Sequence, residues 1–434
     1  MRSRRLPLLE AAQRGRPLEG EARAIDRRWR PSYVVWEITL ACDLACHHCG
    51  SRAGRERPDE LTTEECLDLA DQIAALGANE VTLIGGEAYL RDDWTDVIRR
   101  IRSHGMRCGM ATGARGLTQE RLEAAKAAGM EAISVSLDGL EEEHDALRGV
   151  KGSFRAAVDA MERIRALGGI RLGANTQVNK RNLPVLERLF DVIAERGATA
   201  WQVQLTAAMG RAADPKDGGS FVFLDPYEVL YVHPILARLK REGERRGVTM
   251  WPGNNVGHFG PFEGVIRGHF QAGYRGSCGA GRLSMGIEAN GDIKGCPSLP
   301  SKPYAGGNVR EHKLVDIWER ALPLRLTRDL TARDLKGFCK DCYYAEECRG
   351  GCHWTSHVLL GYPGDNPYCH HRALELMAQG VRERVRMVEA APNEPYDHAR
   401  YVVEREPWPA DERARVERIH AETEAVVWPG TAAE

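Results

Sequence analysis

The sequence has no apolar run of the roughly 18 residues that a membrane-spanning helix requires. The chain begins like a signal peptide, but Glu10 and Arg14 interrupt the apolar region after a few residues. Its 60 basic and 62 acidic side chains give a net charge of -2, so there is no overall attraction to nucleic acid or to an anionic membrane. The sequence therefore predicts a cytoplasmic protein with no nucleic-acid or membrane partner.

No disulfides are expected among the 12 cysteines, because a large chain without an export signal uses cysteine for metal or redox chemistry. Three cysteines lie close together in residues 42–49, and seven lie in residues 278–369. The other two, Cys66 and Cys108, stand alone at helix and strand positions that are typical of core residues. The uneven distribution predicts two separate metal-binding regions.

From residue 33 to about residue 206, short β-branched runs alternate with longer helical patterns, which is typical of βα units on a parallel sheet. Six strands are expected, over residues 34–40, 81–84, 107–111, 132–137, 171–177 and 200–205. Crossovers of this length are right-handed, so the units predict an α/β fold, a partial (β/α)6 barrel of the TIM type. Chemistry is then expected at the carboxyl ends of the strands.

The rest of the chain divides by composition. Residues 1–32 form a basic arm, for which a solvated role is expected and docking of an acidic peptide is the alternative. Residues 207–277 are a bridging region with one helix over residues 226–246. Residues 278–372 are rich in cysteine and glycine, which is typical of a small domain stabilised by metal. Residues 373–434 are expected to form a charged helix and a proline-containing tail.

The first cysteine group directly follows the first expected strand. Cys42, Cys46 and Cys49 have the spacing C-x3-C-x2-C. Three thiolates on a cubane iron–sulfur cluster leave one iron without a protein ligand, and a catalytic metal site needs such an open position. A structural zinc site is the alternative, but it prefers paired C-x2-C units and a fourth nearby ligand. The spacing therefore favours a redox cluster with one open iron.

The second expected strand ends in Gly85, Gly86 and Glu87, at the same edge of the sheet as the cysteine loop. Glycines at this position let a ligand approach bare backbone, and the Glu87 carboxylate can accept a hydrogen bond from an ammonium group. An ordinary strand-to-helix turn is the alternative. The shared edge favours a cofactor site that spans both loops.

Together these two motifs resemble those of radical S-adenosylmethionine (radical SAM) enzymes, and the resemblance covers residues 33–206. It implies that Cys42, Cys46 and Cys49 hold a 4Fe–4S cluster and that SAM chelates the open iron. The reduced cluster would cleave SAM to methionine and a 5′-deoxyadenosyl radical, which abstracts a hydrogen atom from the substrate. An external electron donor such as flavodoxin or ferredoxin is implied as well.

The resemblance also implies further cofactor-binding residues. Ser136 lies where related enzymes hold the SAM ribose, with Asp138 close by, and Arg148 resembles a basic residue near the SAM carboxylate. Asn175 is expected to face the same cavity by strand alternation. His48 stands where an aromatic residue is common, so stacking on adenine would use its imidazole. For Asp138 and Arg148, a turn or an ion pair is the alternative role.

The second cysteine group resembles the SPASM extension of radical SAM enzymes, which binds two auxiliary iron–sulfur clusters. The resemblance assigns one 4Fe–4S cluster to Cys339, Cys342, Cys348 and Cys369. It assigns the other to Cys278, Cys296 and Cys352. A zinc ribbon is the alternative for the first pair of thiols, but seven thiolates exceed the requirement of one zinc ion.

The second auxiliary set is one thiol short. Either one iron is open, in which case it could bind substrate and accept its electron, or another group completes the set. His258, His269 and Tyr274 lie upstream and are the candidates, with surface or packing roles as the alternative.

Radical SAM proteins with this extension mostly modify peptides, so the resemblance implies that a ribosomally made precursor peptide is oxidised, crosslinked or epimerised. Sulfatase maturation is disfavoured, because Pro297 stands where those enzymes usually have an acidic residue. No peptide-binding element precedes the first strand, which implies a separate leader-binding protein or docking elsewhere. The alternatives are the same radical chemistry on a small molecule and a non-catalytic iron–sulfur protein that carries electrons.

Overall fold

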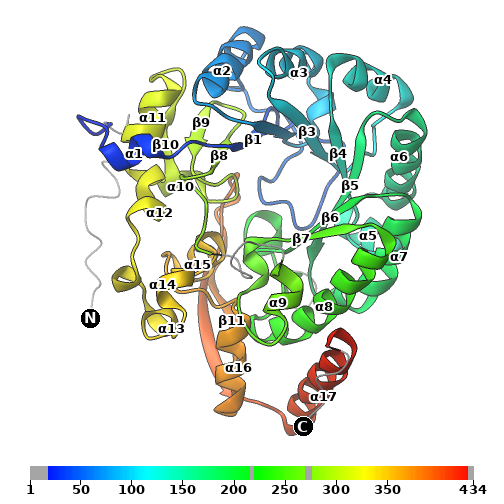
Figure 1. Ribbon diagram of the computed structural model, residues 1–434, viewed down its shortest axis with the longest axis vertical. Coiled ribbons are helices and arrows are strands. Elements are labelled where there is room, and N and C mark those ends of the chain that lie inside the picture. The colour runs from blue at the N-terminus through cyan, green and yellow to red at the C-terminus, as the bar shows by residue number, and fades with distance from the viewer. Residues whose placement is uncertain (1–17, 216–218, 269–275, 429–434) are drawn as a thin grey trace.

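The computed structural model describes residues 18–215, 219–268 and 276–428 of the chain. A ten-stranded sheet curves around a central hollow, in the order β10-β9-β8-β1-β2-β3-β4-β5-β6-β7 (Figure 1). The six expected strands are present and parallel: β1 (Tyr33–Glu37), β2 (Glu80–Ile84), β3 (Arg107–Thr112), β4 (Ala132–Ser136), β5 (Arg171–Val178) and β6 (Ala200–Leu205). The α/β fold of partial-barrel type is confirmed.

Strands from outside the predicted barrel extend the sheet at both edges. In the bridging region, β7 (Thr249–Pro252) pairs in parallel with β6. From the cysteine-rich region, β8 (Ser284–Ile287) pairs in parallel with β1. Beyond it, β9 (Asp292–Lys294) and β10 (Ala305–Asn308) are antiparallel. The cysteine-rich region is therefore joined to the barrel by backbone hydrogen bonds.

Helices surround the outer face of the sheet: α2 (Thr63–Ala75), α3 (Trp94–Ser103), α4 (Gln119–Ala128), α5 (Glu141–Arg148), α6 (Ser153–Leu167), α7 (Leu186–Glu195) and α8 (Val229–Arg246). A capping box formed by Thr62 and Glu65 starts α2, and the Thr118 side chain caps α4. Cys66 on α2 and Cys108 on β3 are buried core residues, as expected. No helix among the residues described is long and apolar enough to cross a membrane.

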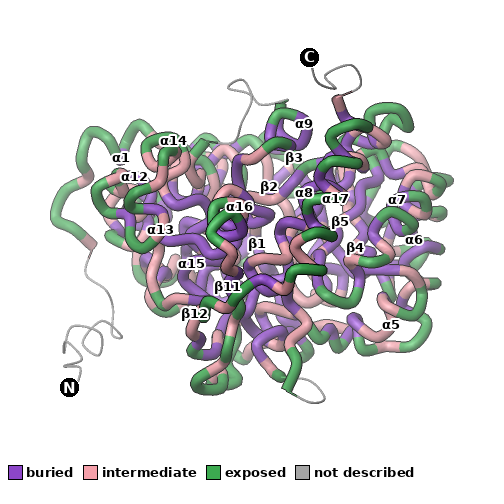
Figure 2. Tube along the Cα trace, turned by 90° about the horizontal axis from the view of Figure 1, so that it is seen from below, coloured by how far each residue is buried: buried purple, intermediate pink, exposed green. Residues whose placement is uncertain are grey.

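Residues along each strand alternate between two surroundings. On β2, Val81 and Leu83 are fully buried in the core shared with the helices, whereas Thr82 and Ile84 are less buried and line the hollow. Figure 2 shows the same contrast for the whole chain, with buried segments inside and exposed segments on the outer helices. The barrel interior is thus an open chamber and not a packed core.

The short helix α9 (Glu263–Arg267) lies in the bridging region. Besides β8, β9 and β10, the cysteine-rich region consists of loops and short helices: α10 (Ser301–Tyr304), α11 (Leu314–Arg320), α12 (Leu326–Asp329), α13 (Gly337–Lys340), α14 (Ala345–Cys348), α15 (His353–Leu360) and α16 (His370–Ala378). The amino-terminal helix α1 (Ala24–Arg28) packs against it, because buried Asp26 forms ion pairs with Arg325 and Arg328 at 3.0 and 3.1 Å. The described part of the basic arm is therefore docked through Asp26, although most of its residues stay exposed to solvent. Residues 1–17 lie outside the described residues.

The carboxy-terminal segment differs from the expected helix and tail. It forms an antiparallel ribbon, β11 (Val381–Glu389) with β12 (Arg400–Pro407), followed by α17 (Ala410–Val427), which packs against α8. In β11, three valines lie among charged residues, and β-branched residues favour strands. Arg382 and Arg386 on β11 also pair with Glu406 and Glu404 on β12, at 2.6 and 2.7 Å. Cross-strand pairing therefore explains the ribbon.

Candidate active site

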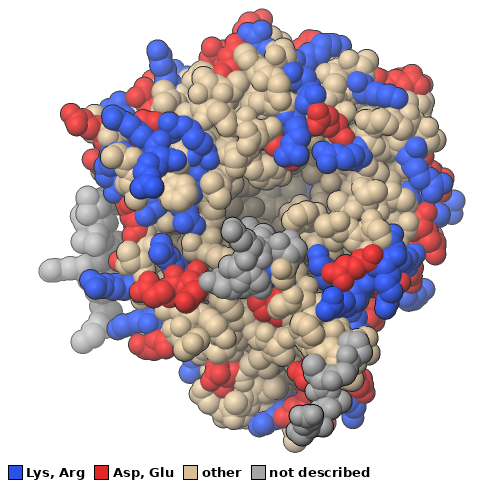
Figure 3. Space-filling model, in the orientation of Figure 1, with Lys and Arg blue, Asp and Glu red and all other residues tan. Residues whose placement is uncertain are grey.

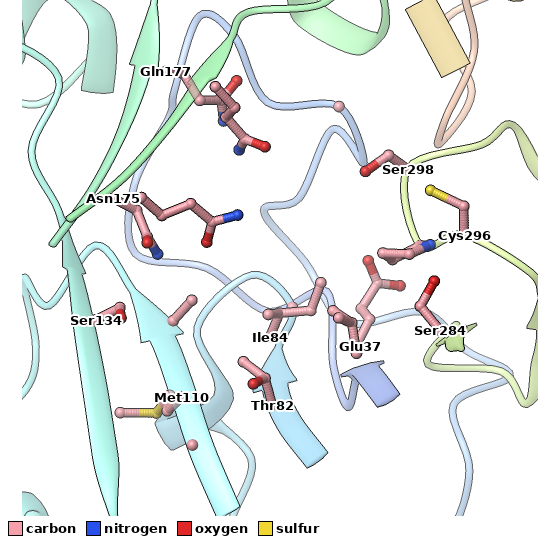
Figure 4. A pocket seen from close by; sticks show the side chains of 18 of the residues that line it. Glu37, Thr82, Ile84, Met110, Ser134, Asn175, Gln177, Ser284, Cys296 and Ser298 are labelled. Atoms are coloured by element: carbon pink, nitrogen blue, oxygen red, sulfur yellow. The ribbon is translucent and has the colours of Figure 1, made fainter. Parts of the chain in front are cut away.

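A cavity of about 640 Å³ occupies the centre of the barrel. Its wall includes inward-facing residues from each of the six expected strands, among them Val35, Thr82, Ala111, Ser134, Asn175 and Gln202. Cys296 and Ser284 of the cysteine-rich region form part of the opposite wall (Figure 4). In Figure 3 the visible walls of the hollow are mostly uncharged. The barrel and the cysteine-rich region thus enclose one chamber between them.

The cysteine loop lies at the carboxyl end of β1. It is closed by backbone hydrogen bonds between Gly54 and both Leu40 and Cys42, at 2.9 and 3.2 Å. Each sulfur of the motif accepts a hydrogen bond: Cys42 from the Leu44 N–H at 3.4 Å, Cys49 from the Ala53 N–H at 3.4 Å, and Cys46 from Arg148 Nη1 at 3.7 Å. Such donors stabilise sulfur that carries negative charge.

The Gly-Gly-Glu turn packs directly against this loop. The Gly86 N–H donates to the Thr39 carbonyl at 2.8 Å, and the Glu87 N–H donates to the Ala41 carbonyl at 2.8 Å. A Cβ atom at Gly86 would lie 2.0 Å from the Ala41 oxygen and 2.8 Å from Cys42 Cβ. No side chain fits there, so Gly86 is required for the close approach of the two loops.

The Glu87 carboxylate is buried and aimed at the cysteine loop. It accepts hydrogen bonds from the Thr112 hydroxyl and, at 2.7 Å, from the Gly113 N–H. Burial raises the pKa of Glu87 to about 7, although these two donors oppose the shift. Ligand atoms of Glu87, Cys42 and Asp43 lie within 4.8 Å of one another. The expected partner of an ammonium group is therefore placed beside the first cysteine.

His48, Asp138 and Arg148 form a buried network behind the cysteine loop. Asp138 Oδ2 lies 2.5 Å from Arg148 Nη2 and 3.0 Å from His48 Nε2, and Asp138 Oδ1 accepts from the Gln177 N–H at 2.7 Å. Burial alone would raise the pKa of Asp138, but Arg148 and then His48 hold it well below its ordinary value. Asp138 and Arg148 thus form the ion pair expected as their alternative role, and Arg148 also contacts Cys46, whereas their contacts with SAM stay a prediction. His48 also lines the cavity.

Ser136 and Asn175 lie opposite each other on β4 and β5. Asn175 lines the cavity, as strand alternation predicts. Ser136 lies two residues after cavity-lining Ser134, and so on the same face of its strand, beyond the described wall of the cavity.

The residues present at the first motif fit an iron–sulfur cluster. Burial raises the pKa of Cys42 to about 12 and that of Cys46 to about 11, so these thiols need a strong cationic group to ionise at neutral pH. The N–H donors on each sulfur suit an anionic group held by the three cysteines. A cluster at these three cysteines would use the donors just described.

The structure also brings together the first auxiliary set of thiols. Burial raises the pKa of Cys348, and nearby Cys369, Cys339 and Cys342 raise it further. Backbone N–H groups of Asn366 and Tyr344 donate to Cys339 and Cys342 at 3.5 and 3.4 Å. The four thiols therefore lie near one another in the fold.

In the second auxiliary set, burial raises the pKa of Cys352 to about 11, and neighbouring Cys296 raises it further. Cys278 lies in the loop where Arg282 donates to its carbonyl at 2.5 Å. Of the expected additional ligands, His258 lies beside Cys369 of the other set, since its carbonyl accepts from that thiol at 3.6 Å. His269 and Tyr274 lie outside the described residues. The imidazole of His258, however, lies against Gly351, which directly precedes Cys352 of this set, so His258 as the fourth ligand stays a prediction.

Several residues of the cavity wall were missed by sequence reasoning. The alternation that identified Asn175 could also have predicted three further inward-facing residues, Gln177, Gln202 and Gln204. Glu37 follows from the same alternation, two residues after Val35. Tyr396 could not be predicted, because the sequence gives no sign that the carboxy-terminal segment returns to β1.

Comparison with known proteins gives the family. Residues 36–178 match the radical SAM superfamily, and residues 278–343 match the iron-sulfur cluster-binding domain SPASM. The chain is 31% identical to the AdoMet-dependent heme synthase of Methanosarcina barkeri over 355 residues, which cover 79% of this chain and 97% of that protein. It is 30% identical to the mycofactocin maturase MftC of Mycobacterium ulcerans over 348 residues, which cover 78% and 86%.

The fold is similar to that of SuiB from Streptococcus suis. The structure of SuiB bound to S-adenosylmethionine has a TM-score of 0.60 at 18% identity, and covers 78% of this chain and 76% of SuiB. SuiB bound to its precursor peptide SuiA gives a TM-score of 0.58 at 19% identity, covering 79% and 76%. The chain belongs to the radical SAM superfamily and carries a SPASM domain, and it is therefore an enzyme that uses 4Fe–4S clusters and SAM.

Proposed function

We propose that this radical SAM/SPASM enzyme oxidatively modifies a ribosomally made precursor peptide. The observation that carries the proposal is an array of four carboxamide side chains on the cavity wall. Asn175 and Gln177 project from β5 (Figure 4), and Gln202 and Gln204 line the cavity from the neighbouring strand β6. The strand register pairs Asn175 with Gln202 and Gln177 with Gln204.

This array suits the backbone of an extended peptide. Each carboxamide offers the same donor and acceptor pair as a peptide group. Residues two apart on a strand are separated by about 7 Å, which is also the repeat at which an extended peptide presents groups on one side. The array therefore matches a peptide backbone in both chemistry and spacing.

The relatives include heme synthases as well as peptide maturases, and the charge of the cavity favours a peptide. A tetrapyrrole of the heme type carries carboxylates, which proteins bind with arginine or lysine. Neither residue type occurs among the described residues of the cavity wall, and Glu37 and Glu80 are acidic. We therefore rank a tetrapyrrole second, after a precursor peptide, as a candidate substrate.

The chain's own residues have distinct roles in the proposed reaction. Cys42, Cys46 and Cys49 would hold the SAM-cleaving cluster, which with bound SAM supplies a radical that abstracts hydrogen. The backbone of Gly85 and Gly86 together with Glu87 would hold the SAM amino group. Further contacts to SAM are assigned to His48, Ser136 and Asn175.

The C-terminal thiols would hold two auxiliary clusters. One set is Cys339, Cys342, Cys348 and Cys369, and the other is Cys278, Cys296 and Cys352. Because Cys296 lines the cavity, an electron acceptor at the second set would lie beside the substrate. This arrangement supports oxidation, since the electron has a short path out of the chamber.

The proposal is tested with enzyme reconstituted under anaerobic conditions, SAM, dithionite and each short peptide encoded beside the gene. We expect 5′-deoxyadenosine together with a mass change of one of these peptides. Conversion of a carboxylated tetrapyrrole with no change in any neighbouring peptide would instead support the heme-synthase alternative. The same assay with flavodoxin or ferredoxin in place of dithionite identifies the electron donor.

Replacing Gln177 and Gln202 together by leucine should lower kcat/KM for the peptide by roughly 10- to 100-fold, because two of the proposed backbone contacts are lost. Cleavage of SAM without peptide should change by less than about twofold, since neither residue contacts the cysteine loop through its side chain in the structure. The control is Gln379→Leu at an exposed position after α16. Unchanged peptide kinetics in the double variant would remove the array from the binding site.

A further inference from the structure

Glu37 is a buried carboxylate that faces the cavity and that the roles above leave unused. It is the last residue of β1, and alternation with Val35 places its side chain on the inner wall, opposite Asn175 (Figure 4). One of its oxygens accepts a hydrogen bond from the Tyr396 hydroxyl, and the other lies 3.4 Å from the Ala289 N–H. The Glu37 carboxylate is therefore placed where it can contact a substrate bound in the cavity.

The neighbouring charges do not neutralise Glu37 directly. Lys294 Nζ lies 2.8 Å from Glu288 and 3.8 Å from the centre of the Tyr396 ring. Glu288 also pairs with Arg57 at 3.1 Å. Lys294 and Arg57 therefore form their ion pairs with Glu288, and the direct side-chain partner of Glu37 is the neutral phenol of Tyr396.

Tyr396 is held in place by an elaborate local structure. Its backbone has φ of +58°, which a bulky residue adopts only where its surroundings hold it. Its N–H donates to the Gly50 carbonyl at 3.1 Å, directly after the cysteine loop. Next to it, Asp397 pairs with Arg52 at 2.8 Å and accepts from the Asn393 and Glu394 N–H groups at 2.6 and 3.0 Å. The segment between β11 and β12 thus positions the Tyr396 hydroxyl against Glu37.

We propose that Glu37 is the catalytic base that accepts a proton from the substrate during its oxidation, and that Tyr396 is its positioning residue. The inference rests on the oxidation proposed above but not on the peptide nature of the substrate. A base for this step has to face the chamber and has to be free of a permanent ion pair, and Glu37 meets both conditions.

The protonation of Glu37 is poised for this role. Burial raises the pKa of Glu37 to about 7, and Glu288 raises it further, whereas Tyr396, Lys294 and the Ala289 N–H lower it. Arg57 lies on the far side of Glu288. A base whose pKa lies near neutral pH takes a proton efficiently and releases it again.

The proposed step balances as follows. The substrate first loses one hydrogen atom, which forms a C–H bond of 5′-deoxyadenosine. An adjacent bond to hydrogen then breaks, and its proton converts the Glu37 carboxylate to the acid. Of the three electrons that remain, two form the new bond of the product. The third passes to an oxidised iron–sulfur cluster of the SPASM domain, so that the substrate loses two electrons and two protons in total.

A labelling experiment tests the site without any substrate. Reconstituted enzyme is treated anaerobically with dicyclohexylcarbodiimide, which modifies protonated carboxyls that it can reach, and is then mapped by peptide mass spectrometry. We expect Glu37 to be labelled at about pH 6 and at least roughly tenfold less at about pH 9. Glu87 is the internal control, because burial raises its pKa to about 7 as well but it does not line the cavity. Labelling of Glu87 without Glu37 would overturn the proposal.

Variants then test the chemistry on the peptide converted in the assay above. Glu37→Gln should lower product formation by roughly 100-fold or more, whereas deuterium still passes from labelled peptide into 5′-deoxyadenosine.

Tyr396→Phe should shift the pH at which the rate of product formation rises to a higher value, because the lost hydrogen bond had lowered the pKa of Glu37. Glu389→Gln and Tyr343→Phe are exposed matched controls. Product formation by Glu37→Gln within about threefold of wild type, or an unshifted profile for Tyr396→Phe, would refute the roles.

Discussion

Replacing Gly86 by alanine should lower SAM cleavage by roughly 100-fold or more, because a displacement near 1 Å at a catalytic centre has effects of this size. The added Cβ would lie 2.0 Å from the Ala41 carbonyl oxygen and 2.8 Å from Cys42 Cβ. Both neighbours belong to the cysteine loop itself, so the loop has to move. The measurement is 5′-deoxyadenosine formed per reconstituted enzyme, together with its iron and sulfide content.

The matched control is Gly109→Ala. Gly109 lies on β3 within the same barrel, and its added Cβ would meet its nearest neighbour, Thr82 Oγ1, at an ordinary 3.5 Å. This variant should cleave SAM at a rate within about twofold of the wild type. Equal rates for Gly86→Ala and Gly109→Ala would show that the contact between the two loops is dispensable for the cofactor site.

Replacing Arg148 by methionine should reduce the free energy of unfolding by about 3–5 kcal/mol, the usual cost of leaving one partner of a buried ion pair unpaired. Asp138 would lose its 2.5 Å contact with Arg148 and would keep only His48 and the Gln177 N–H. Cys46 would lose its side-chain donor as well. The measurement is anaerobic urea denaturation of reconstituted protein, followed by circular dichroism.

Two further variants separate the causes of this loss. Arg100→Met removes an arginine of similar geometry from an exposed pair with Asp71 on the outer helices, and should leave the denaturation midpoint unchanged. Arg148→Met combined with Asp138→Leu should be more stable than Arg148→Met alone, because no buried charge is left unpaired. If the double variant is instead the less stable one, the loss comes from packing around Cys46 and not from the stranded carboxylate.

The parts of the fold that sequence reasoning found are those with strong local signals. In β2 and β4, β-branched residues coincide with period-two burial, and the two motifs follow strand ends directly. The ribbon of β11 and β12 was missed because its stability comes from pairs such as Arg382 with Glu406, which are distant in sequence. Likewise, β8 is short and contains a glycine, and its pairing with β1 has no local signature.

The same distinction applies to the site. The thiols of the cysteine loop and the glycines beside them follow from spacing alone, because the chemistry requires those residue types at those intervals. Asp138 and Arg148 could be placed near the loop, but only their contacts show that they neutralise each other behind Cys46. Tyr396 meets Glu37 from far along the chain, and a sequence offers no means of pairing the two.

The parallel pairing of β8 with β1 has a consequence for biosynthesis. During translation, β1 emerges early, yet the strand that covers its free edge is made only after the whole barrel. Until then the nascent chain exposes an unpaired edge and an open chamber. The wall of the chamber around the first three cysteines is therefore completed only when residues 284–287 pair with β1.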